Sequence, residues 1–429
     1  MQQILFTVYH LAWRAALPLL RRSPRLRHGW TQRTLEQAPT GPFDLWIQSA
    51  SGGESLLTQT VLAELATLLS GTTELRVLAT SGTKQGVDSL RKGCAAIRQD
   101  TPIRTTVGYF PFDDPALMTR ALQRFSPRLI VLLETELWPG LLRAARQHRL
   151  PVLLLNGRMS SGSHRRYRLL RWLLRPVRPT RILAISAADR ARFAHILGPG
   201  AIDQMDNIKF DRINDQGQPG AKPHWATLLP PGNHFVLLGS IRREEEEKII
   251  TTIVGLLAAR PDIVIGVFPK HIERADRWLA KLAARGITAG RRSRAMTPAA
   301  AGSVLVWDLF GELADAYGLA KVTFIGGSLM DLGGQNFLEP LVFGLRPFIG
   351  PYWSNFAWVS REIVTVGLVR EVADEKHLLA ELLAALDRDE PRALVRRQVQ
   401  QFLAPRRGGS RLAAREIAAF LFPDENENR

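Results

Sequence analysis

Cysteine is the scarcest residue type in this chain, since Cys94 is the only one among 429 residues. A single thiol excludes an intramolecular disulfide and a cysteine-rich metal site, and it suits a reducing, cytoplasmic environment. The nine histidines are scattered, and the sequence has neither an H-E-x-x-H motif nor a paired-cysteine spacing. The sequence therefore predicts no metal site. Internal repeats, coiled-coil heptads and low-complexity tracts are also missing.

Acidic residues are in deficit, because 40 Asp and Glu stand against 57 Lys and Arg, which gives a net charge of +17. This excess favours an anionic partner such as nucleic acid, an acidic membrane surface or a phosphorylated substrate. The apolar fraction of 45% is ordinary for a globular protein. The length predicts roughly two to three domains.

The apolar N-terminal stretch, residues 4–20, is short for a hydrocarbon core about 30 Å thick and contains His10 and Arg14. It has no small-residue cleavage site, and its basic residues follow the apolar part, so we expect no exported signal peptide. On a helix the polar stripe holds Thr7, His10, Arg14 and Arg21, and the apolar stripe holds Ile4, Val8, Leu11, Ala15 and Leu19. The pattern predicts a helix lying in a membrane interface, or alternatively a helix packed on the protein's own core.

Short apolar runs alternate with helical patterns along the whole chain, which is typical of parallel α/β units. The predicted strands are 44–50, 75–80, 128–134, 151–156 and 181–186, and then 235–240, 263–268, 303–308, 322–325 and 347–350. A polar stretch rich in Gly and Pro, residues 213–223, reads as a linker. We predict an α/β fold with two doubly wound Rossmann-like domains, 29–212 and 224–429, facing each other across a cleft. Residues 1–28 form the basic apolar membrane-associating segment, and a C-terminal helix completes the second domain.

A glycine-rich stretch, residues 326–340, follows the predicted strand 322–325 and precedes a predicted helix. Paired glycines let backbone N–H groups approach an anion, and a helix N-terminus adds positive partial charge. The stretch therefore predicts a phosphate site. Glu339, one turn into the helix, is anionic, so we expect it to accept hydrogen bonds from ribose hydroxyls. Phosphate and ribose together indicate a nucleotide.

Carboxylates follow two predicted strands of the first half. Glu54 stands in a glycine-rich turn after residues 44–50, where it could take a proton from an attacking hydroxyl or merely complement a helix dipole. Glu134 and Glu136 follow a very apolar strand and need partners, for which Arg158 and Lys209 are candidates. Structural and catalytic roles both remain open for this pair.

Polar turns also end the predicted strands of the second half. Arg242 or Arg243 could stabilise a departing phosphate. The acidic run 244–247 is interpreted as a solvated helix start rather than a ligand set. The turns at 268–271 and 310–313 could frame a base and a ribose.

Seven arginines alternate with leucines and Trp172 over residues 164–181. This basic amphipathic segment predicts contact with a membrane surface. The nucleic-acid alternative lacks a recognisable binding module, so we expect no nucleic-acid partner.

Taken together, these motifs resemble the 3-deoxy-D-manno-octulosonic acid (Kdo) transferases, a family of GT-B glycosyltransferases. The resemblance runs from about Leu45 to Trp358, and its motifs occupy residues 51–54, 110–113, 134–139, 156–158, 207–211, 269–271, 311–313 and 326–340. It implies metal-independent transfer of Kdo from CMP-Kdo, without a further cofactor. The implied acceptor is a lipid A precursor, lipid IVA, at the cytoplasmic face of the bacterial inner membrane during lipopolysaccharide biosynthesis.

The resemblance also implies roles for single residues. Glu54 would deprotonate the acceptor hydroxyl, with inversion at the sugar. The nucleotide-sugar site would comprise Ser240, Arg242, Pro269, Lys270, Gly311, Glu312, Gly326, Gly327, Ser328, Asn336 and Glu339. The chain departs from the family pattern at Gly52, Ile241, Ile272 and Gln335, where valine, threonine, proline and histidine are usual. Two alternatives are a related GT-B transferase with another nucleotide sugar and a lipid acceptor, and a non-catalytic membrane-associated protein that binds nucleotide or nucleic acid.

Overall fold

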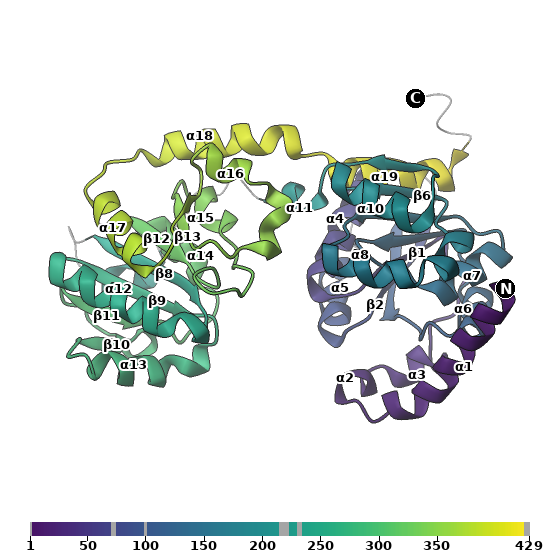
Figure 1. The fold of residues 1–429 in the computed structure, drawn as a ribbon, viewed down its shortest axis with the longest axis horizontal. Helices are drawn as coiled ribbons and strands as arrows, with labels where there is room; N and C mark the ends of the chain where they lie inside the picture. Colours follow the sequence, from purple (N-terminus) through teal and green to yellow (C-terminus); the bar gives the residue numbers. More distant parts are fainter. Residues whose placement is uncertain (1, 70–73, 98–100, 214–222, 230–233, 424–429) are drawn as a thin grey trace. The chain divides into compact units, whose positions relative to one another are not determined.

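A computed structural model describes residues 2–69, 74–97, 101–213, 223–229 and 234–423 (Figure 1). The chain divides into two compact units, residues 1–212 with 406–429, and residues 213–405. The predicted linker, 213–223, lies almost wholly outside the described residues.

The first unit contains a parallel sheet of seven strands in the order β3-β2-β1-β4-β5-β6-β7. The strands are β1 (Leu45–Ser49), β2 (Leu75–Ser81), β3 (Ile103–Tyr109), β4 (Leu129–Leu133), β5 (Val152–Gly157), β6 (Arg181–Ala184) and β7 (Ile202–Gln204). In the register, Ile47 of β1 lies beside Ala79 of β2 and Val131 of β4. The strand order reverses between β1 and β4, and such switch points are where doubly wound sheets bind ligands.

Helices cover both faces of this sheet (Figure 1). They are α1 (Gln2–Leu20), α2 (Pro24–Arg27), α3 (Trp30–Arg33), α4 (Gly52–Leu68), α5 (Lys84–Ile97), α6 (Pro115–Phe125), α7 (Pro139–Gln147), α8 (Ser161–Leu169), α9 (Arg171–Leu174), α10 (Ala187–Leu197), α11 (Ile208–Asp211) and α19 (Gly409–Leu421). Successive residues of a strand point to opposite faces of the sheet. Trp46 therefore packs with α6 and α7, whereas Leu45 and Ile47 pack with α4 and α19. Burial on both faces explains why the strands are nearly continuous apolar runs.

The last helix, α19, belongs to the first unit, whereas the sequence-based division included it in the second domain. Its apolar stripe of Ala413, Ala414, Ile417 and Leu421 is buried in the layer that contains α4. The carboxylate of Asp211 accepts hydrogen bonds from the N–H groups of Gly408 and Ser410, both at 2.7 Å, at the start of the helix. An apolar stripe predicts a packed helix but does not reveal which sheet it covers.

The second unit also contains a parallel sheet of seven strands, in the order β10-β11-β9-β8-β12-β13-β14. The strands are β8 (Phe235–Ile241), β9 (Val264–Pro269), β10 (Ala289–Arg291), β11 (Ser303–Val306), β12 (Val322–Ile325), β13 (Pro347–Ile349) and β14 (Arg370–Glu371). Its order reverses between β8 and β12, which defines a second switch point.

Helices of the second unit pack against this sheet (Figure 1). The α-helices are α12 (Glu246–Ala259), α13 (Ala275–Ala283), α14 (Leu313–Leu319), α15 (Leu338–Val342), α16 (Glu362–Thr365), α17 (Glu375–Leu386) and α18 (Arg392–Leu403). Short 3-10 turns, η3 (Arg243–Glu245) and η4 (Ile272–Arg274), lead into α12 and α13. Ile249 and Ile253 of α12 pack with Leu378 and Leu382 of α17 in one core layer.

The N-terminal helix α1 packs on the first unit along one side and exposes apolar residues on another. Phe6 is 1% exposed, and the Tyr9 hydroxyl donates to Asp113 Oδ2 at 2.9 Å. Apolar side chains on the outer side remain exposed, namely Ile4, Val8, Leu11 and Leu19. None of the described helices combines the length and the hydrophobicity needed to cross a bilayer. One side of α1 therefore packs on the protein's own core, as the alternative prediction stated.

Candidate functional site

The first candidate site lies at the switch point of the first sheet, where β1 leads into α4. Gly52 is the first residue of α4, so Glu54 stands in its first turn. Glu54 Oε2 accepts the N–H of Ala50 at 2.5 Å. Its Oε1 makes no hydrogen bond to any described residue. One oxygen is thus held by the backbone while the other can accept a bond from a substrate hydroxyl.

The surroundings of Glu54 favour its protonated form more than water does. Burial, followed by repulsion from Glu134 and Glu136, raises the pKa of Glu54 from its ordinary value to about 7. The Ala50 N–H and the charge of Lys209 act in the opposite direction and are weaker. A carboxylate with a pKa near neutrality is suited to accept a proton in a reaction at neutral pH.

The two carboxylates after β4 have separate partners. Glu134 Oε1 forms an ion pair with Lys209 Nζ at 2.5 Å, which confirms one of the two predicted partners. Glu136 is buried, and its Oε2 accepts Gln48 Nε2 at 3.1 Å and Trp138 Nε1 at 2.8 Å. Burial raises the pKa of Glu136. Both side chains are therefore bonded within the fold, and their negative charges help to raise the pKa of Glu54.

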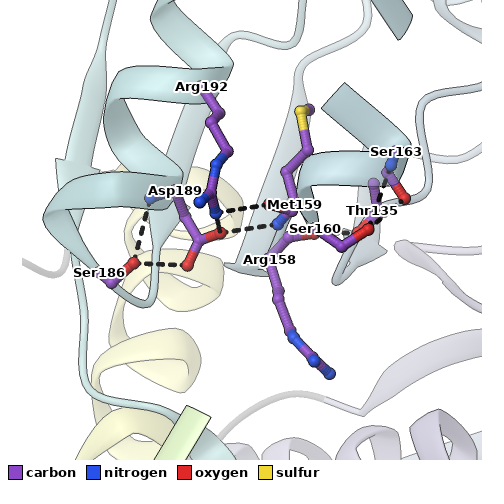
Figure 2. Close-up of polar contacts among 8 residues, drawn as sticks. All are labelled: Thr135, Arg158, Met159, Ser160, Ser163, Ser186, Asp189 and Arg192. Atoms are coloured by element: carbon purple, nitrogen blue, oxygen red, sulfur yellow. Dashed lines mark hydrogen bonds and ion pairs between the residues drawn. The ribbon is translucent and has the colours of Figure 1, made fainter. Parts of the chain in front are cut away.

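Arg158, the other predicted partner, forms no ion pair with these carboxylates. Its backbone carbonyl accepts the Thr135 hydroxyl, and the Tyr167 hydroxyl donates to the Thr135 carbonyl at 3.0 Å. The guanidinium of Arg158 makes no hydrogen bond or ion pair within the described ranges, and Figure 2 shows it directed away from the cluster around Asp189. Tyr167 and Thr135 thus fix the turn that contains Glu134 and leave the Arg158 side chain available.

The loop that contains Arg158 is held from its other side by Asp189 (Figure 2). Asp189 Oδ1 accepts the N–H of Met159 at 2.8 Å, and Oδ2 accepts the Ser186 hydroxyl at 2.5 Å. Arg192 Nη1 donates to the Met159 carbonyl at 2.8 Å. These contacts fix the backbone beside the site independently of any ligand.

At the second switch point, between β8 and β12, a carboxylate of the chain fills a nest of backbone N–H groups. Glu245 Oε1 accepts the N–H groups of Ser328 at 2.9 Å and Leu329 at 2.8 Å. Its Oε2 accepts those of Gly327 and Arg242, the latter at 3.3 Å. The side chain is 0% exposed. Nests of this kind bind anions, and here the anion is the chain's own carboxylate.

This arrangement differs from the predicted phosphate contact at the glycines. The N–H groups of Gly327 and Ser328 already bind Glu245. The backbone at Gly326 lies so close to the end of β8 that only glycine fits. A Cβ there would lie 2.8 Å from both Ile241 Cα and the Ser240 carbonyl oxygen. The glycines therefore join β12 to the end of β8 rather than presenting a vacant anion site.

The predictions for the acidic run 244–247 and for the helix after the glycines also need correction. Residues 244 and 247 are exposed, as a solvated helix start requires, but Glu245 and Glu246 are buried. The helix after the glycines, α15, begins only at Leu338. Glu339 is therefore its second residue rather than one turn into it, because the glycine-rich turns extend the loop.

Several predicted nucleotide residues do lie together at the end of this sheet. Ser240 and Pro269 belong to the last residues of the adjacent strands β8 and β9. Asn336 Nδ2 donates to Glu339 Oε1 at 2.8 Å. Burial raises the pKa of Glu339, and the Asn336 hydrogen bond and the charge of Lys270 partly oppose this. Asn336 and Lys270 thus both act on the Glu339 carboxylate.

The carboxylate of Glu312 is hydrogen-bonded to other residues of the protein. It accepts Arg292 Nη2 at 2.9 Å and Trp307 Nε1 at 2.8 Å. These bonds fix the loop that contains Gly311. A Cβ built on Gly311 would meet no atom within 4 Å, so the backbone there is open. Glu312 is a loop anchor, and the open backbone at Gly311 is what a ligand could approach.

Glu245 and Tyr167 are the main residues that the sequence reasoning missed. The spacing of Arg242 and Glu245 is that of a capping box, in which a side chain three residues on returns to the cap N–H. That spacing was a usable signal for Glu245. Nothing local indicates that Tyr167 reaches the turn after β4. The described residues hold no group of three or more His, Cys, Asp or Glu arranged for a metal ion.

Comparison with known proteins gives a consistent family. Residues 22–212 match the family model described as 3-deoxy-D-manno-octulosonic-acid transferase (kdotransferase). A 3-deoxy-D-manno-octulosonic acid transferase of Bordetella pertussis is 30% identical over 427 residues, covering 94% of this chain and 96% of the relative. The Chlamydophila psittaci enzyme of the same name is 26% identical over 374 residues, covering 85% and 82%.

A solved structure supports the fold alone. The crystal structure of a glycosyltransferase from Rickettsia africae aligns with a TM-score of 0.57 at 10% identity, covering 89% of this chain and 99% of that one. Two parallel-sheet Rossmann-like units therefore occur together in a glycosyltransferase.

Proposed function

Since the chain belongs to the 3-deoxy-D-manno-octulosonic acid (Kdo) transferase family, we propose that it transfers Kdo from CMP-Kdo to a lipid A precursor, lipid IVA, with Glu54 as general base. Glycosyl transfer of Kdo in lipopolysaccharide biosynthesis follows from the family. The donor nucleotide, the acceptor and the base are our proposal. The observation that carries it is the partly buried Glu54, with a pKa of about 7 and one unbonded oxygen at a sheet switch point.

In the proposed reaction the acceptor hydroxyl donates its proton to Glu54 Oε1 as its oxygen attacks the anomeric carbon of Kdo. The bond from that carbon to the CMP phosphate oxygen breaks, and the electron pair leaves with CMP. Attack from the face opposite to CMP inverts the anomeric centre. The Ala50 N–H fixes the carboxylate during this step, and burial maintains the basicity that proton transfer requires.

The donor is proposed to bind in the second unit and the acceptor in the first. Glu339, oriented by Asn336, would accept hydrogen bonds from the ribose hydroxyls. Lys270 and Arg242 would meet the phosphate. Since the nest at Gly327 already contains a carboxylate, the donor phosphate is expected beside it rather than in it. No cofactor or metal takes part in the proposed reaction.

We further propose that the first unit binds the cytoplasmic face of the bacterial inner membrane. The exposed apolar residues of α1 and Trp172, which is 57% exposed near the α8 arginines, support this. The triple change Ile4→Ser, Val8→Ser and Leu11→Ser should reduce co-sedimentation with anionic vesicles without disturbing the buried side of α1. Leu394→Ser, an exposed residue of α18, is the matched control. Equal co-sedimentation of both variants would contradict attachment through α1.

The activity itself is tested with purified enzyme, CMP-Kdo and a tetra-acylated lipid A precursor, with the product identified by mass spectrometry. Glu54→Gln should lower kcat by about 10²- to 10⁴-fold, because it removes the proton acceptor. Glu64→Gln on the same helix α4 is the control and should leave kcat unchanged. A Glu54→Gln variant with the normal rate would exclude Glu54 as the base. No Kdo transfer by the unmodified enzyme would exclude the proposed substrates.

A further inference from the structure

Most of a basic pocket in the second unit lies outside the nucleotide contacts above. It has a volume of about 370 Å³ and lies where β8 and β9 lead into η3 and η4. Its lining residues are Arg242, Arg243, Glu244, His271, Glu273, Arg274 and Arg277. We call it the arginine pocket. Arg242 is the one residue that it shares with the predicted nucleotide-sugar set.

Only one of the four guanidinium groups in the arginine pocket is hydrogen-bonded to a carboxylate of the described residues. Arg274 forms a bidentate pair with the buried Glu246, at 2.6 and 2.8 Å. Arg243 and Arg277 are exposed and make no side-chain hydrogen bond or ion pair with any described residue. Their charge is therefore available to a ligand.

Arg242 provides a second sign that the pocket suits an anion. Its Nε is buried and has no hydrogen-bond partner in the part of the chain that the structure describes. The nearest carboxylate oxygen, in Glu244, is 3.8 Å away, which is too long for a hydrogen bond. A buried donor without an acceptor is unfavourable, because it has lost its hydrogen bonds to water. An anion bound in the pocket would supply the missing acceptor.

The donor of the proposed reaction carries two anionic groups, the phosphate of CMP and the carboxylate of the sugar. The nest beside Gly327 is filled by Glu245 and can take neither. Arg242 links the nucleotide residues to the arginine pocket, so a group attached to the nucleotide can extend into it. A volume of about 370 Å³ is at the small end of ligand pockets and suits one sugar ring rather than a lipid.

We propose that the arginine pocket binds the carboxylate of the Kdo moiety, an inference that rests on the proposed donor. A planar carboxylate matches the paired N–H groups of a guanidinium, and such charge-assisted pairs are stronger than neutral hydrogen bonds. A nucleotide sugar without a carboxylate would leave the guanidinium groups of Arg243 and Arg277 unpaired. The pocket therefore selects nucleotide-activated sugar acids over neutral nucleotide sugars.

The test is calorimetric binding of CMP-Kdo and of CMP, without acceptor, to the full chain and its variants. The double variant Arg243→Ala, Arg277→Ala should weaken CMP-Kdo binding by about 10-fold or more, the loss expected for hydrogen bonds to a charged group. Its affinity for CMP should not change. Arg397→Ala, an exposed arginine of α18, is the matched control and should change neither. Because Arg243 and Arg277 are exposed, the melting temperature of the double variant should equal that of the unmodified chain.

Three results would overturn the inference. Unchanged CMP-Kdo affinity in the double variant would show that the pocket does not meet the sugar acid. Equal weakening of CMP and CMP-Kdo would assign the arginines to the phosphate. Unchanged CMP-Kdo affinity together with a raised KM for the lipid acceptor would assign them to the acceptor. Binding of CMP-Kdo without any transfer by the unmodified enzyme would contradict the proposed function instead, and the double variant would still test the pocket.

Discussion

Replacing Glu54 by glutamine should stabilise the first unit at alkaline pH while it abolishes the proposed base. The pKa of Glu54 in the folded protein is raised, mainly by burial, to about 7, whereas an unfolded glutamate titrates near its ordinary value of about 4.3. Between these two values the folded protein holds a proton that the unfolded chain has released. The free energy of unfolding therefore falls as pH rises through this window.

The size of this effect follows from the same pKa. Each pH unit between the two values corresponds to about 1.36 kcal/mol, so the upper bound is about 3 to 4 kcal/mol above pH 7. Glu54 remains partly exposed, and solvent reduces the effect to about 2 kcal/mol. Glutamine has no charge to lose, and its amide oxygen can still accept the Ala50 N–H. The stability difference between Glu54→Gln and the unmodified chain should thus grow by about 2 kcal/mol from pH 5 to pH 8.

The assay is urea denaturation of both proteins at pH 5 and pH 8, with Glu64→Gln measured in parallel. Glu64 lies on the same helix, so its variant controls for the substitution itself. The control should show the same difference from the unmodified chain at both pH values. A Glu54→Gln variant whose relative stability is also independent of pH would refute a raised pKa at Glu54, and with it the reason for assigning this carboxylate as the base.

Four further predictions concern other parts of the molecule. Lys209→Met removes the partner of the half-buried Glu134 and a charge that lowers the pKa of Glu54, so it should destabilise the first unit by about 2 kcal/mol and shift the acid limb of the pH–rate profile upward. Glu245→Ala leaves three loop N–H groups without their acceptor, so the KM for CMP-Kdo should rise and the second unit should melt earlier, as calorimetry would detect. Truncation after residue 405 removes α19 with its buried Ile417 and Leu421, at about 1.5 to 3 kcal/mol each, so denaturation should unfold the first unit selectively. Treatment with EDTA should leave kcat unchanged, and a loss restored by a divalent cation would contradict metal-independent transfer.

The alternation of strands and helices could be predicted from the sequence, but the edges of the sheets could not. All ten predicted strands are strands of the structure, because burial on both faces demands a continuous apolar segment. The missed strands are β3, β7, β10 and β14. All four are outermost in their sheets, and β10 and β14 have only two or three residues, none of them buried. Only two of the seven positions of β3 are buried, so it lacks the uniform apolar signal.

The first candidate site was more predictable than the second for a physical reason. The turn after β1 places Glu54 in the first helical turn directly, so sequence neighbours determine where its carboxylate lies. In the second unit, the partner of the glycine-rich loop is Glu245, which comes from a different strand end more than 80 residues away. Only the order of strands in the sheet brings β8 beside β12. A local pattern can therefore predict a nest, but it does not identify the anion that fills it.

Glu54 and Glu245 occupy corresponding places in the two units, yet their bonds allow only one of them to act as a base. Each follows the first strand of its unit, and each strand borders the switch point of its sheet. Glu245 accepts four backbone N–H groups, two on each oxygen, so its lone pairs are all engaged. Glu54 accepts one N–H and keeps an oxygen without a described partner. The number of backbone donors thus separates a carboxylate that holds a loop together from one that can take a proton.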